Sequence, residues 1–248
     1  MDFPKVLVNF DHELNKECWY KSTYTSPVSY CDIFARHGII VLAALPTQYP
    51  EGLLKRLVEM ADGFMFIGGR DYPAEYFGFP ETEHEDPVTF DRSKNDVILF
   101  RLAWQTNKPM LGICQGIQLA TLAMGGCIIP HLDDPDNLHR SEDGCSDVMH
   151  DIKLATGKLS AVFRTNELVV NSSHHQAVDP DSVPDLFQIT GHAPDGTVEA
   201  IERKMRGFGI FMQWHPERHP NESHRETLFG EFTKAVKHSY NSRIGTRL

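Results

Sequence analysis

The sequence predicts an α/β fold with a mostly parallel central sheet, helices on both faces of the sheet, and a small antiparallel addition. In the first half, short apolar runs alternate with amphipathic segments four times, which is the pattern of successive strand–helix units. Several of these runs are apolar at nearly every position, as is typical of strands covered on both faces. The second half contains short strand-like runs separated by turn residues, which predicts the β-rich addition.

The first half has a long segment, residues 72–91, that is rich in proline, glutamate and aromatic side chains and indicates a functional loop. The helix after this loop is expected to have Asp91 as its N-cap. The remaining expectations follow from near-continuous apolar runs for strands and from amphipathic spacing for helices. Strands are expected at 5–10, 39–45, 64–67 and from 109, and helices at 22–37, 53–61 and 91–106.

In the second half, Asp195-Gly196 is a strong signal for a hairpin turn between two strands. The last helix is expected to begin near His224, with a frayed tail after Tyr240. Because no repeat, low-complexity stretch or linker is apparent, we expect one domain over residues 1–248. Strands are expected at 127–132, 148–155, 167–171, 186–190, 198–203 and 209–214, and a short helix at 157–163.

The overall composition is that of a soluble globular protein with a real core, since 41% of the residues are hydrophobic and 23% are charged. A net charge of −10 argues against nucleic acid or an anionic membrane as a partner. The five cysteines include no C-x-x-C pair, so we expect a reduced protein of the cytoplasm. No signal peptide is recognised, and no apolar run approaches the ~20 residues of a membrane helix.

Residues 109–126, PMLGICQGIQLATLAMGG, read as buried strand, sharp turn and buried helix. Gly112, Cys114 and Gly116 form the G-x-C-x-G pattern of a nucleophile elbow, which lifts one nucleophilic atom above the sheet. The partial positive charge at the helix N-terminus favours the thiolate of Cys114. Taken alone, the pattern fits a buried cysteine that packs as a small hydrophobe equally well.

A catalytic cysteine requires a base, and the strongest candidate lies in residues 213–217, QWHPE, directly after an apolar strand. His215 would be the base, and Glu217 would accept a hydrogen bond from the imidazole and fix its tautomer. The alternative is a loop histidine beside a solvated glutamate, because thirteen histidines make chance pairings common.

Together these motifs resemble the class I glutamine amidotransferase family: an elbow cysteine is followed by H-x-E about a hundred residues later. The γ-glutamyl hydrolase branch, peptidase C26, which includes the γ-glutamyl-γ-aminobutyrate hydrolases, is the most similar. The resemblance implies a flavodoxin-like fold. It rests on five segments in order, FIGGRDYPAEYFG, PMLGICQGIQLATLAMGG, VNSSHHQAV, APDGTVEAIE and MQWHPE.

The resemblance implies catalytic roles for three residues: Cys114 as nucleophile, His215 as general base and then acid, and Glu217 as the orienting carboxylate. Attack on a γ-glutamyl amide would form a glutamyl thioester, and water would then release glutamate. The backbone N–H groups of Gly69 and Gln115 would form the oxyanion hole. No cofactor is implied.

The resemblance also implies a glutamyl pocket. Gln118 lies one helical turn after Cys114 and would hold the amino-acid end of the substrate. Of the neighbouring His174 and His175, only one is expected to face the site if both lie on a strand. The implied substrate-binding residues are Gly68, Arg70, Gln118, His174, His175 and Gln176. Histidines 174, 175, 215, 219 and 224 are poorly spaced for a metal, so no metal site is predicted.

Two departures bear on the leaving amine. Residue 115 is often arginine in the γ-glutamyl-γ-aminobutyrate hydrolases, so Gln115 suggests an altered leaving-group preference. The loop at 72–91 would favour a cationic amine, such as a polyamine, if its acidic side chains face the cleft, whereas a solvated loop would have no such effect. These acidic residues are Glu75, Glu81, Glu83, Glu85 and Asp86.

Three functions are compatible with these motifs. The first is a stand-alone hydrolase of small γ-glutamyl amines, for which the family resemblance suggests a homodimer. The second is a glutaminase subunit that delivers ammonia to a separate synthase partner. The third is a homologue that no longer catalyses a reaction and keeps the triad as structure.

Overall fold

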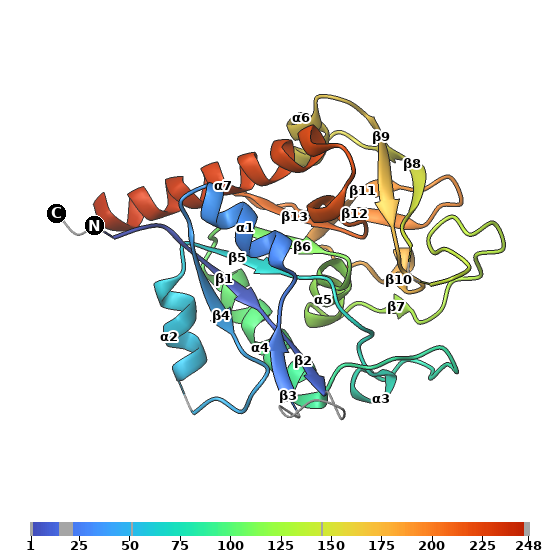
Figure 1. Cartoon of the computed structure of the whole chain (residues 1–248), viewed down its shortest axis with the longest axis horizontal. Helices are drawn as coiled ribbons and strands as arrows, with labels where there is room; N and C mark the ends of the chain where they lie inside the picture. Colours follow the sequence, from blue (N-terminus) through green and yellow to red (C-terminus); the bar gives the residue numbers. More distant parts are fainter. Residues whose placement is uncertain (1, 15–21, 51, 145, 246–248) are drawn as a thin grey trace.

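The computed structural model describes residues 2–14, 22–50, 52–144 and 146–245. It is built on one mixed, mostly parallel sheet with helices on both faces (Figure 1), which confirms the predicted fold class. Five neighbouring strands are parallel, and four further strands continue the same sheet in antiparallel order. The order is β4 (Ile40–Ala44), β1 (Lys5–Asn9), β5 (Gly63–Phe66), β6 (Met110–Ile113), β13 (Gly209–Met212), β12 (Val198–Arg203), β11 (Phe187–His192), β8 (Val148–Leu154) and β9 (Glu167–Ser172).

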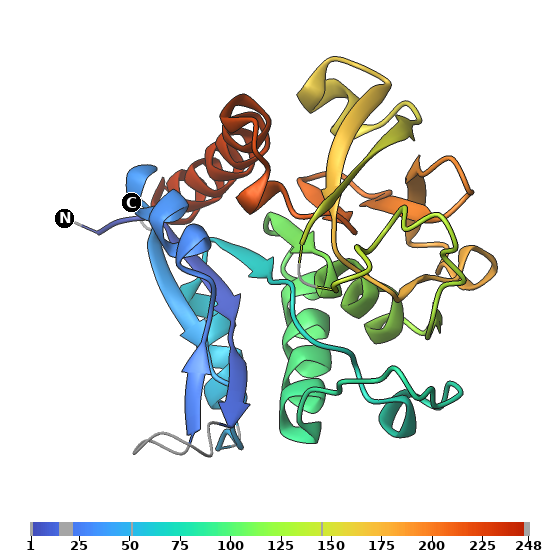
Figure 2. The same ribbon diagram turned by 45° about the vertical axis from the view of Figure 1, so that its right-hand side comes forward.

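The parallel strands separate two apolar cores, because alternate side chains of a strand point to opposite faces. Phe64 and Phe66 pack into one core, whereas Met65 and Ile67 pack into the other. Figure 2 shows α7 on one side of the sheet and α4 and α5 on the other. One face carries α1 (Val28–Arg36) and α7 (Glu222–Gly245), and the other carries α2 (Leu53–Met60), α4 (Phe90–Gln105) and α5 (Gln115–Ala123).

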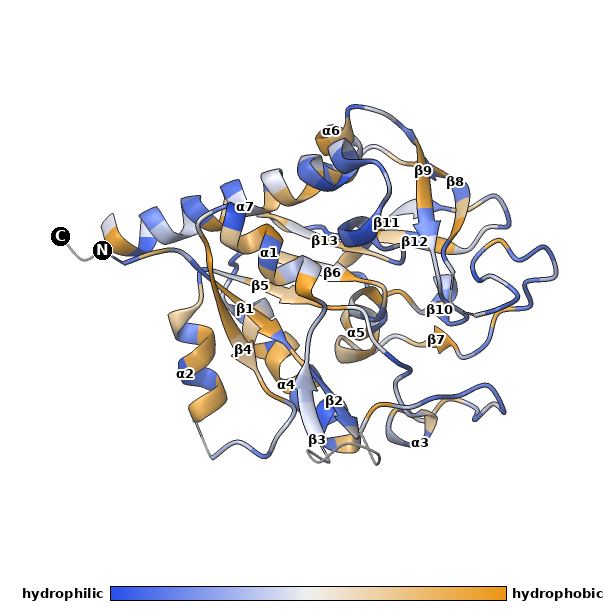
Figure 3. Ribbon diagram, viewed as in Figure 1, coloured by the Kyte–Doolittle hydropathy of each residue, from blue (hydrophilic) through white to orange (hydrophobic). Residues whose placement is uncertain are grey.

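The helices show the expected amphipathic pattern. Figure 3 shows polar and apolar turns alternating along α7, beside apolar strands in the middle of the sheet. Leu228, Phe229, Phe232 and Val236 form the apolar stripe of α7, and all four are fully buried. No helix among the described residues has a stretch long and apolar enough to span a bilayer.

The helix predicted at 22–37 is shorter than expected. Ser22–Thr25 is a strand, β3, which pairs with β2 (Asp11–Leu14) in a separate two-stranded sheet. Its Thr-Tyr-Thr sequence favours a strand, and Pro27 prevents the helix from extending backwards past Val28. The N-cap of α4 is Thr89 rather than Asp91, since the Thr89 side chain accepts a hydrogen bond from the Arg92 N–H.

Two predictions in the second half also change, and one is confirmed. The strand expected at 127–132 is only Ile128–Ile129 (β7), which pairs with an unpredicted strand, Ala177–Val178 (β10). The tail after Tyr240 is helical to Gly245. The hairpin turn is confirmed, because Gly196 has φ of 92° between β11 and β12. The other short helices are α3 (Ala74–Phe77), α6 (Lys158–Phe163), η1 (Pro180–Ser182) and η2 (Pro216–Arg218).

Candidate active site

Cys114 occupies the sharp turn between β6 and α5, with φ of 50° and ψ of −104°. A non-glycine residue rarely adopts a positive φ, so the surrounding packing must hold this strained turn in place. Gly116 is required for that packing, because a Cβ there would lie 2.5 Å from the carbonyl oxygen of Phe66. The turn therefore has the backbone that the G-x-C-x-G pattern predicts.

Cys114 is 6% exposed and lies at the N-terminus of α5. The Nε2 of Gln213 donates a long hydrogen bond to Cys114 Sγ at 3.7 Å. A Cβ on Gly68 would be 3.0 Å from Cε1 of His215 and 3.4 Å from Cβ of Cys114. Both side chains thus lie against Gly68, at the carboxyl ends of β5, β6 and β13.

His215 and Glu217 point toward one another, as the sequence predicted. The Nδ1 of His215 lies 2.8 Å from Oε1 of Glu217, and both residues are buried. Burial by itself would lower the pKa of His215, but the Glu217 carboxylate and an ionised Cys114 outweigh it and raise that pKa to about 10. Since Nδ1 is taken by Glu217, Nε2 is the ring nitrogen left for Cys114. The structure brings the predicted triad together.

Tyr30 of α1 is a neighbour of the triad that no sequence motif identifies. Its side chain is buried beside Glu217 and the backbone of Gly68. Burial raises the pKa of Tyr30 well above its usual range, and the negative charges of Glu217 and of an ionised Cys114 raise it further. Tyr30 and Glu217 are 187 positions apart in the 248-residue chain (217 − 30), so no local motif links the two.

The loop after β5 lies against the first residue of α5. A Cβ on Gly69 would lie 2.7 Å from Oε1 of Gln115, so the two residues are in contact. Gly69 and Gln115, whose backbone N–H groups are assigned to the oxyanion hole, are therefore in contact with each other in space.

The side chain of Gln115 is buried and does not line the cavity in front of Cys114. Its Nε2 donates to the carbonyl of Arg70, and its Oε1 accepts from Nη2 of Arg92 at 3.1 Å. Arg92 is itself fully buried and paired with Asp96 at 2.5 Å and Asp11 at 3.0 Å. These contacts hold the Gln115 amide against the glycine loop, away from the cavity. An altered leaving-group preference stays a prediction.

A cavity of about 290 Å³ opens in front of Cys114. It contains most of the predicted substrate-binding residues, together with carboxylates and guanidinium groups from separate loops. A second, more open cavity of about 570 Å³ adjoins it and shares His174 and His175, but Cys114 does not line it. The residues that line the smaller cavity are Gly69, Arg70, Asp71, His84, Asp86, Cys114, Gln118, Arg140, Gly144, Ser173, His174, His175 and Gln176.

Both histidines of the predicted pair line this cavity, contrary to the expectation that only one would. Strand β9 ends at Ser172, so the alternation of a strand does not apply to them. His174 is the more buried and shares a hydrogen bond with the carbonyl of Gln176, whereas Nε2 of His175 lies 3.1 Å from the Asp71 carboxylate. Gln118 donates to the same Gln176 carbonyl at 3.2 Å.

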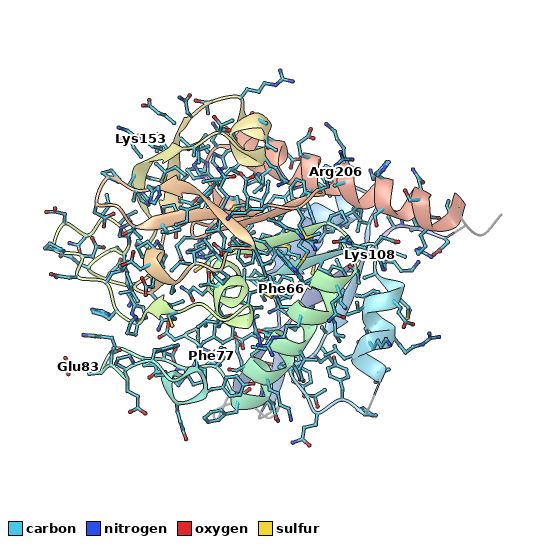
Figure 4. The ribbon with its side chains drawn as sticks, turned by 180° about the vertical axis from the view of Figure 1, so that it is seen from behind. Phe66, Phe77, Glu83, Lys108, Lys153 and Arg206 are labelled. Carbon is cyan, nitrogen blue, oxygen red and sulfur yellow. The ribbon has the colours of Figure 1, made fainter. Side chains whose placement is uncertain are left out.

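The acidic loop contributes one carboxylate to the cavity, that of Asp86. Glu85 accepts a hydrogen bond from the backbone N–H of Ala74, and Glu83 pairs with His84. Figure 4 shows Glu83 projecting outward at the tip of the loop. Most of the loop's acidic side chains therefore do not line the cavity. Asp86 does, together with Asp71, which directly precedes the loop.

Apart from the triad, one group among the described residues has the composition of a metal site. His139, His174 and Glu199 are buried, and each offers a ligand atom within 4.8 Å of the others. The sequence predicted no such site, because these residues come from three separate segments.

Comparison with known proteins places this geometry in a family. The chain is 29% identical over 204 residues to the glutamine amidotransferase-like protein YvdE of Lactococcus lactis (80% of this chain, 83% of that protein). It is 26% identical over 217 residues to the γ-glutamyl-γ-aminobutyrate hydrolase PuuD of Escherichia coli K12 (82% and 84%).

Among solved structures, the fold is similar to the glutaminase domain of a Trypanosoma brucei CTPS with bound acivicin. The TM-score is 0.66 at 12% identity, with 94% of each chain covered. The Peptidase C26 family model matches residues 6–217, a span that includes the elbow and His215-Pro216-Glu217. The chain therefore belongs to the Peptidase C26 family.

Proposed function

We propose that this protein hydrolyses the γ-glutamyl amide bond of small γ-glutamyl amines and releases glutamate. The observation that carries the proposal is a buried cysteine on a strained elbow beside a histidine whose Nδ1 is 2.8 Å from a carboxylate. The relatives named above support the class of reaction, since one of them is a γ-glutamyl-γ-aminobutyrate hydrolase.

In the proposed reaction, the Cys114 thiolate attacks the γ-carbonyl carbon and forms a C–S bond. The carbonyl oxygen becomes an oxyanion, which the N–H groups of Gly69 and Gln115 stabilise. The His215 imidazolium then donates a proton to the leaving nitrogen as the C–N bond breaks, which leaves a thioester. Water, deprotonated by His215, attacks the thioester, and the C–S bond breaks to release glutamate and to restore the Cys114 thiolate beside the His215 imidazolium.

The charges around the cavity suit a glutamyl amine. Arg70 and Arg140 offer cations for the α-carboxylate, and Asp71 and Asp86 offer carboxylates for an ammonium group of the glutamyl moiety or of the leaving amine. Gln118 would hold the amino-acid end of the substrate from the floor of the cavity. This arrangement favours small zwitterionic or cationic conjugates over peptides with apolar side chains.

The proposal is tested by incubating the purified protein with a panel of γ-glutamyl conjugates of γ-aminobutyrate, polyamines and apolar amines, and measuring released glutamate. We expect hydrolysis of one or more of the small polar conjugates, and its loss in Cys114→Ala. Cys127→Ala is the matched control, because Cys127 is an exposed free cysteine that does not line the cavity. Full activity in Cys114→Ala would exclude the mechanism.

A second candidate is a glutaminase subunit that transfers ammonia to a synthase. The structural similarity to a glutaminase domain favours it. The same panel distinguishes the two functions if glutamine is included. A hydrolase prefers γ-glutamyl amines in kcat/KM without any partner, whereas a subunit hydrolyses glutamine and requires its synthase for full activity.

A further inference from the structure

Glu199 of β12 is a fully buried carboxylate surrounded by histidines that the proposed reaction does not use. Its Oε1 lies 3.3 Å from Nδ1 of His139 and 3.4 Å from Nε2 of His174. Nε2 of a third histidine, His150, is 3.8 Å away and is hydrogen-bonded to Ser172 at 2.8 Å. A carboxylate and two imidazoles thus converge on one buried point.

The converging atoms do not form hydrogen bonds of good geometry with one another. Among the described residues, Oε1 and Oε2 of Glu199, Nδ1 of His139 and Nε2 of His174 have no hydrogen-bond partner of acceptable geometry. Unpaired polar atoms are rare in protein interiors, because burial removes the water that would otherwise bond them. The short separations combined with the missing hydrogen bonds indicate a shared partner between these atoms.

The contacts of the other nitrogen of each ring favour a cation as that partner. Nδ1 of His174 lies 3.1 Å from the Gln176 carbonyl, which can only accept, so this nitrogen carries the proton. Nε2 of His139 likewise faces the Asp195 carboxylate at 3.0 Å. In the neutral rings, the lone pairs of His139 Nδ1 and His174 Nε2 then both face a carboxylate oxygen. A cation at the centre converts that repulsion into coordination.

The two separations between Glu199 and the histidines match those between donors on a tetrahedral zinc ion. With bonds of about 2.0–2.1 Å, two donors on such an ion lie about 3.4 Å apart. Zinc-bound histidines commonly donate their other N–H to a carboxylate or a backbone carbonyl, as His139 and His174 do here. We propose that His139, His174 and Glu199 bind one divalent metal ion of the zinc class, with the fourth position for water or His150.

The site would join three separate segments at the wall of the active-site cavity. His139 belongs to the irregular segment between β7 and β8, and His174 lies between β9 and β10 and lines the cavity. Glu199 lies on β12, and its carbonyl accepts the backbone N–H of Gln213, the residue whose amide contacts Cys114. The role inferred for the metal is therefore structural: it holds the cavity wall against the sheet.

Zinc binding is tested on untagged protein that carries Cys114→Ala, so that the active-site thiol cannot bind metal. After equilibration with zinc alone and removal of the excess, we expect about one zinc ion per chain by elemental analysis. The thermal midpoint should rise by about 5–10 °C at saturating zinc. X-ray absorption should show only N/O ligands near 2.0–2.1 Å.

Variants in the same background locate the site. Glu199→Gln and His139→Gln should each lose the bound zinc and the thermal shift, and Asp195→Asn should weaken binding about 10- to 100-fold. His192→Gln, an exposed histidine of β11, should retain both. Near-ultraviolet circular dichroism checks folding. If Glu199→Gln does not fold, zinc binding by His139→Gln alone tests the location of the site.

The proposal is overturned if the protein with the intact site binds no zinc, or if folded His139→Gln binds zinc as tightly as that protein does. Sulfur ligands in the absorption spectrum would also overturn it. None of these measurements uses hydrolysis, so the metal proposal and the proposed function can fail independently.

Discussion

At the scale of single residues, the raised pKa of His215 is the main electrostatic feature of the candidate site. Burial opposes the charged form, but the Glu217 carboxylate and an ionised Cys114 together raise its pKa from 6.5 to about 10. A group with a raised pKa stays protonated until the pH passes that value. The proposed proton donor to the leaving amine is therefore present across the neutral range and is lost as the pH rises through about 10.

Glu217→Gln should shift this limit. The amide keeps an oxygen for Nδ1 of His215 but removes the negative charge, so the pKa of His215 should fall. We expect the alkaline limb of the kcat/KM profile to move to lower pH, and kcat to fall about 100- to 10,000-fold. Steady-state rates of γ-glutamyl amide hydrolysis between pH 6 and 10.5 measure both effects.

The matched control for this change is Glu226→Gln. Glu226 is also a carboxylate beside a histidine, His37, at 3.4 Å, but it lies on the surface of α7. Its profile should equal that of the unchanged protein. An alkaline limb that stays in place in Glu217→Gln would refute the assignment of Glu217 as the charge that maintains the imidazolium.

At the scale of secondary-structure elements, the candidate oxyanion hole depends on contacts between the end of β5, the start of α5 and the start of α4. The glycine loop follows β5, Gln115 begins α5, and Arg92 lies in the first turn of α4. The buried amide of Gln115 connects the other two through Arg70 and Arg92. The relative position of the two proposed N–H donors thus depends on a side chain that does not line the cavity.

Gln115→Met preserves the shape of this side chain and removes both hydrogen bonds. As a positioning residue, Gln115 should affect kcat, by about 10- to 100-fold, and leave KM within about twofold, since displaced oxyanion donors act mainly in the transition state. The pH profile should keep its shape, because the triad is intact. Kinetics with one γ-glutamyl amine, together with thermal unfolding, provide the measurement.

Gln188→Met on the exposed side of β11 is the control and should change neither parameter. If Gln115→Met raised KM and left kcat unchanged, the side chain would be a substrate contact and the bracing role would be wrong.

At the scale of the whole molecule, the C-terminal helix is tied to the amino ends of the parallel strands. Nε of Arg243 donates to Oδ1 of Asp62 at 2.7 Å, and Asp62 is fully buried just before β5. Asp62 also accepts the backbone N–H of Lys5, so the same carboxylate joins α7 to β1. Cys114 lies at the opposite, carboxyl end of the strands, so this contact concerns stability rather than the site.

Arg243→Gln should therefore destabilise the fold without altering chemistry. Removal of a cation from a buried carboxylate costs about 1–3 kcal/mol, which corresponds to a fall of roughly 2–10 °C in Tm for a chain of this size. The free energy of unfolding in urea and kcat at 25 °C are the two measurements. Arg206→Gln, at an exposed arginine labelled in Figure 4, should change neither.

A lower kcat per folded molecule in Arg243→Gln would show that the tie between α7 and β1 reaches the site, against this expectation. Equal Tm values for the two variants would show that the Asp62 contact contributes nothing to stability.

Elements that depend on local pattern were predictable. The strands β1, β5 and β6 follow from near-continuous apolar runs, since a strand buried on both faces has no polar face. The apolar run of β4 also predicts a strand, although β4 is the edge strand and is only partly buried. The strand β3 (Ser22–Thr25) is not predictable from local pattern, because its partner strand, β2, lies earlier in the chain. The helical tail was missed because Arg243 is held by Asp62, a residue distant in sequence.

The sequence by itself determined the fold class, the elbow at Cys114 and the pairing of His215 with Glu217, because each depends on short-range spacing along one strand or turn. The roles of these residues stay predictions until they are tested by substitution. Only the tertiary structure decided that Gln115 braces a loop, that Tyr30 adjoins the triad, and that Glu199 gathers two distant histidines. The physical reason is that buried polar groups must find partners, and in a folded chain those partners come from wherever the sheet brings segments together.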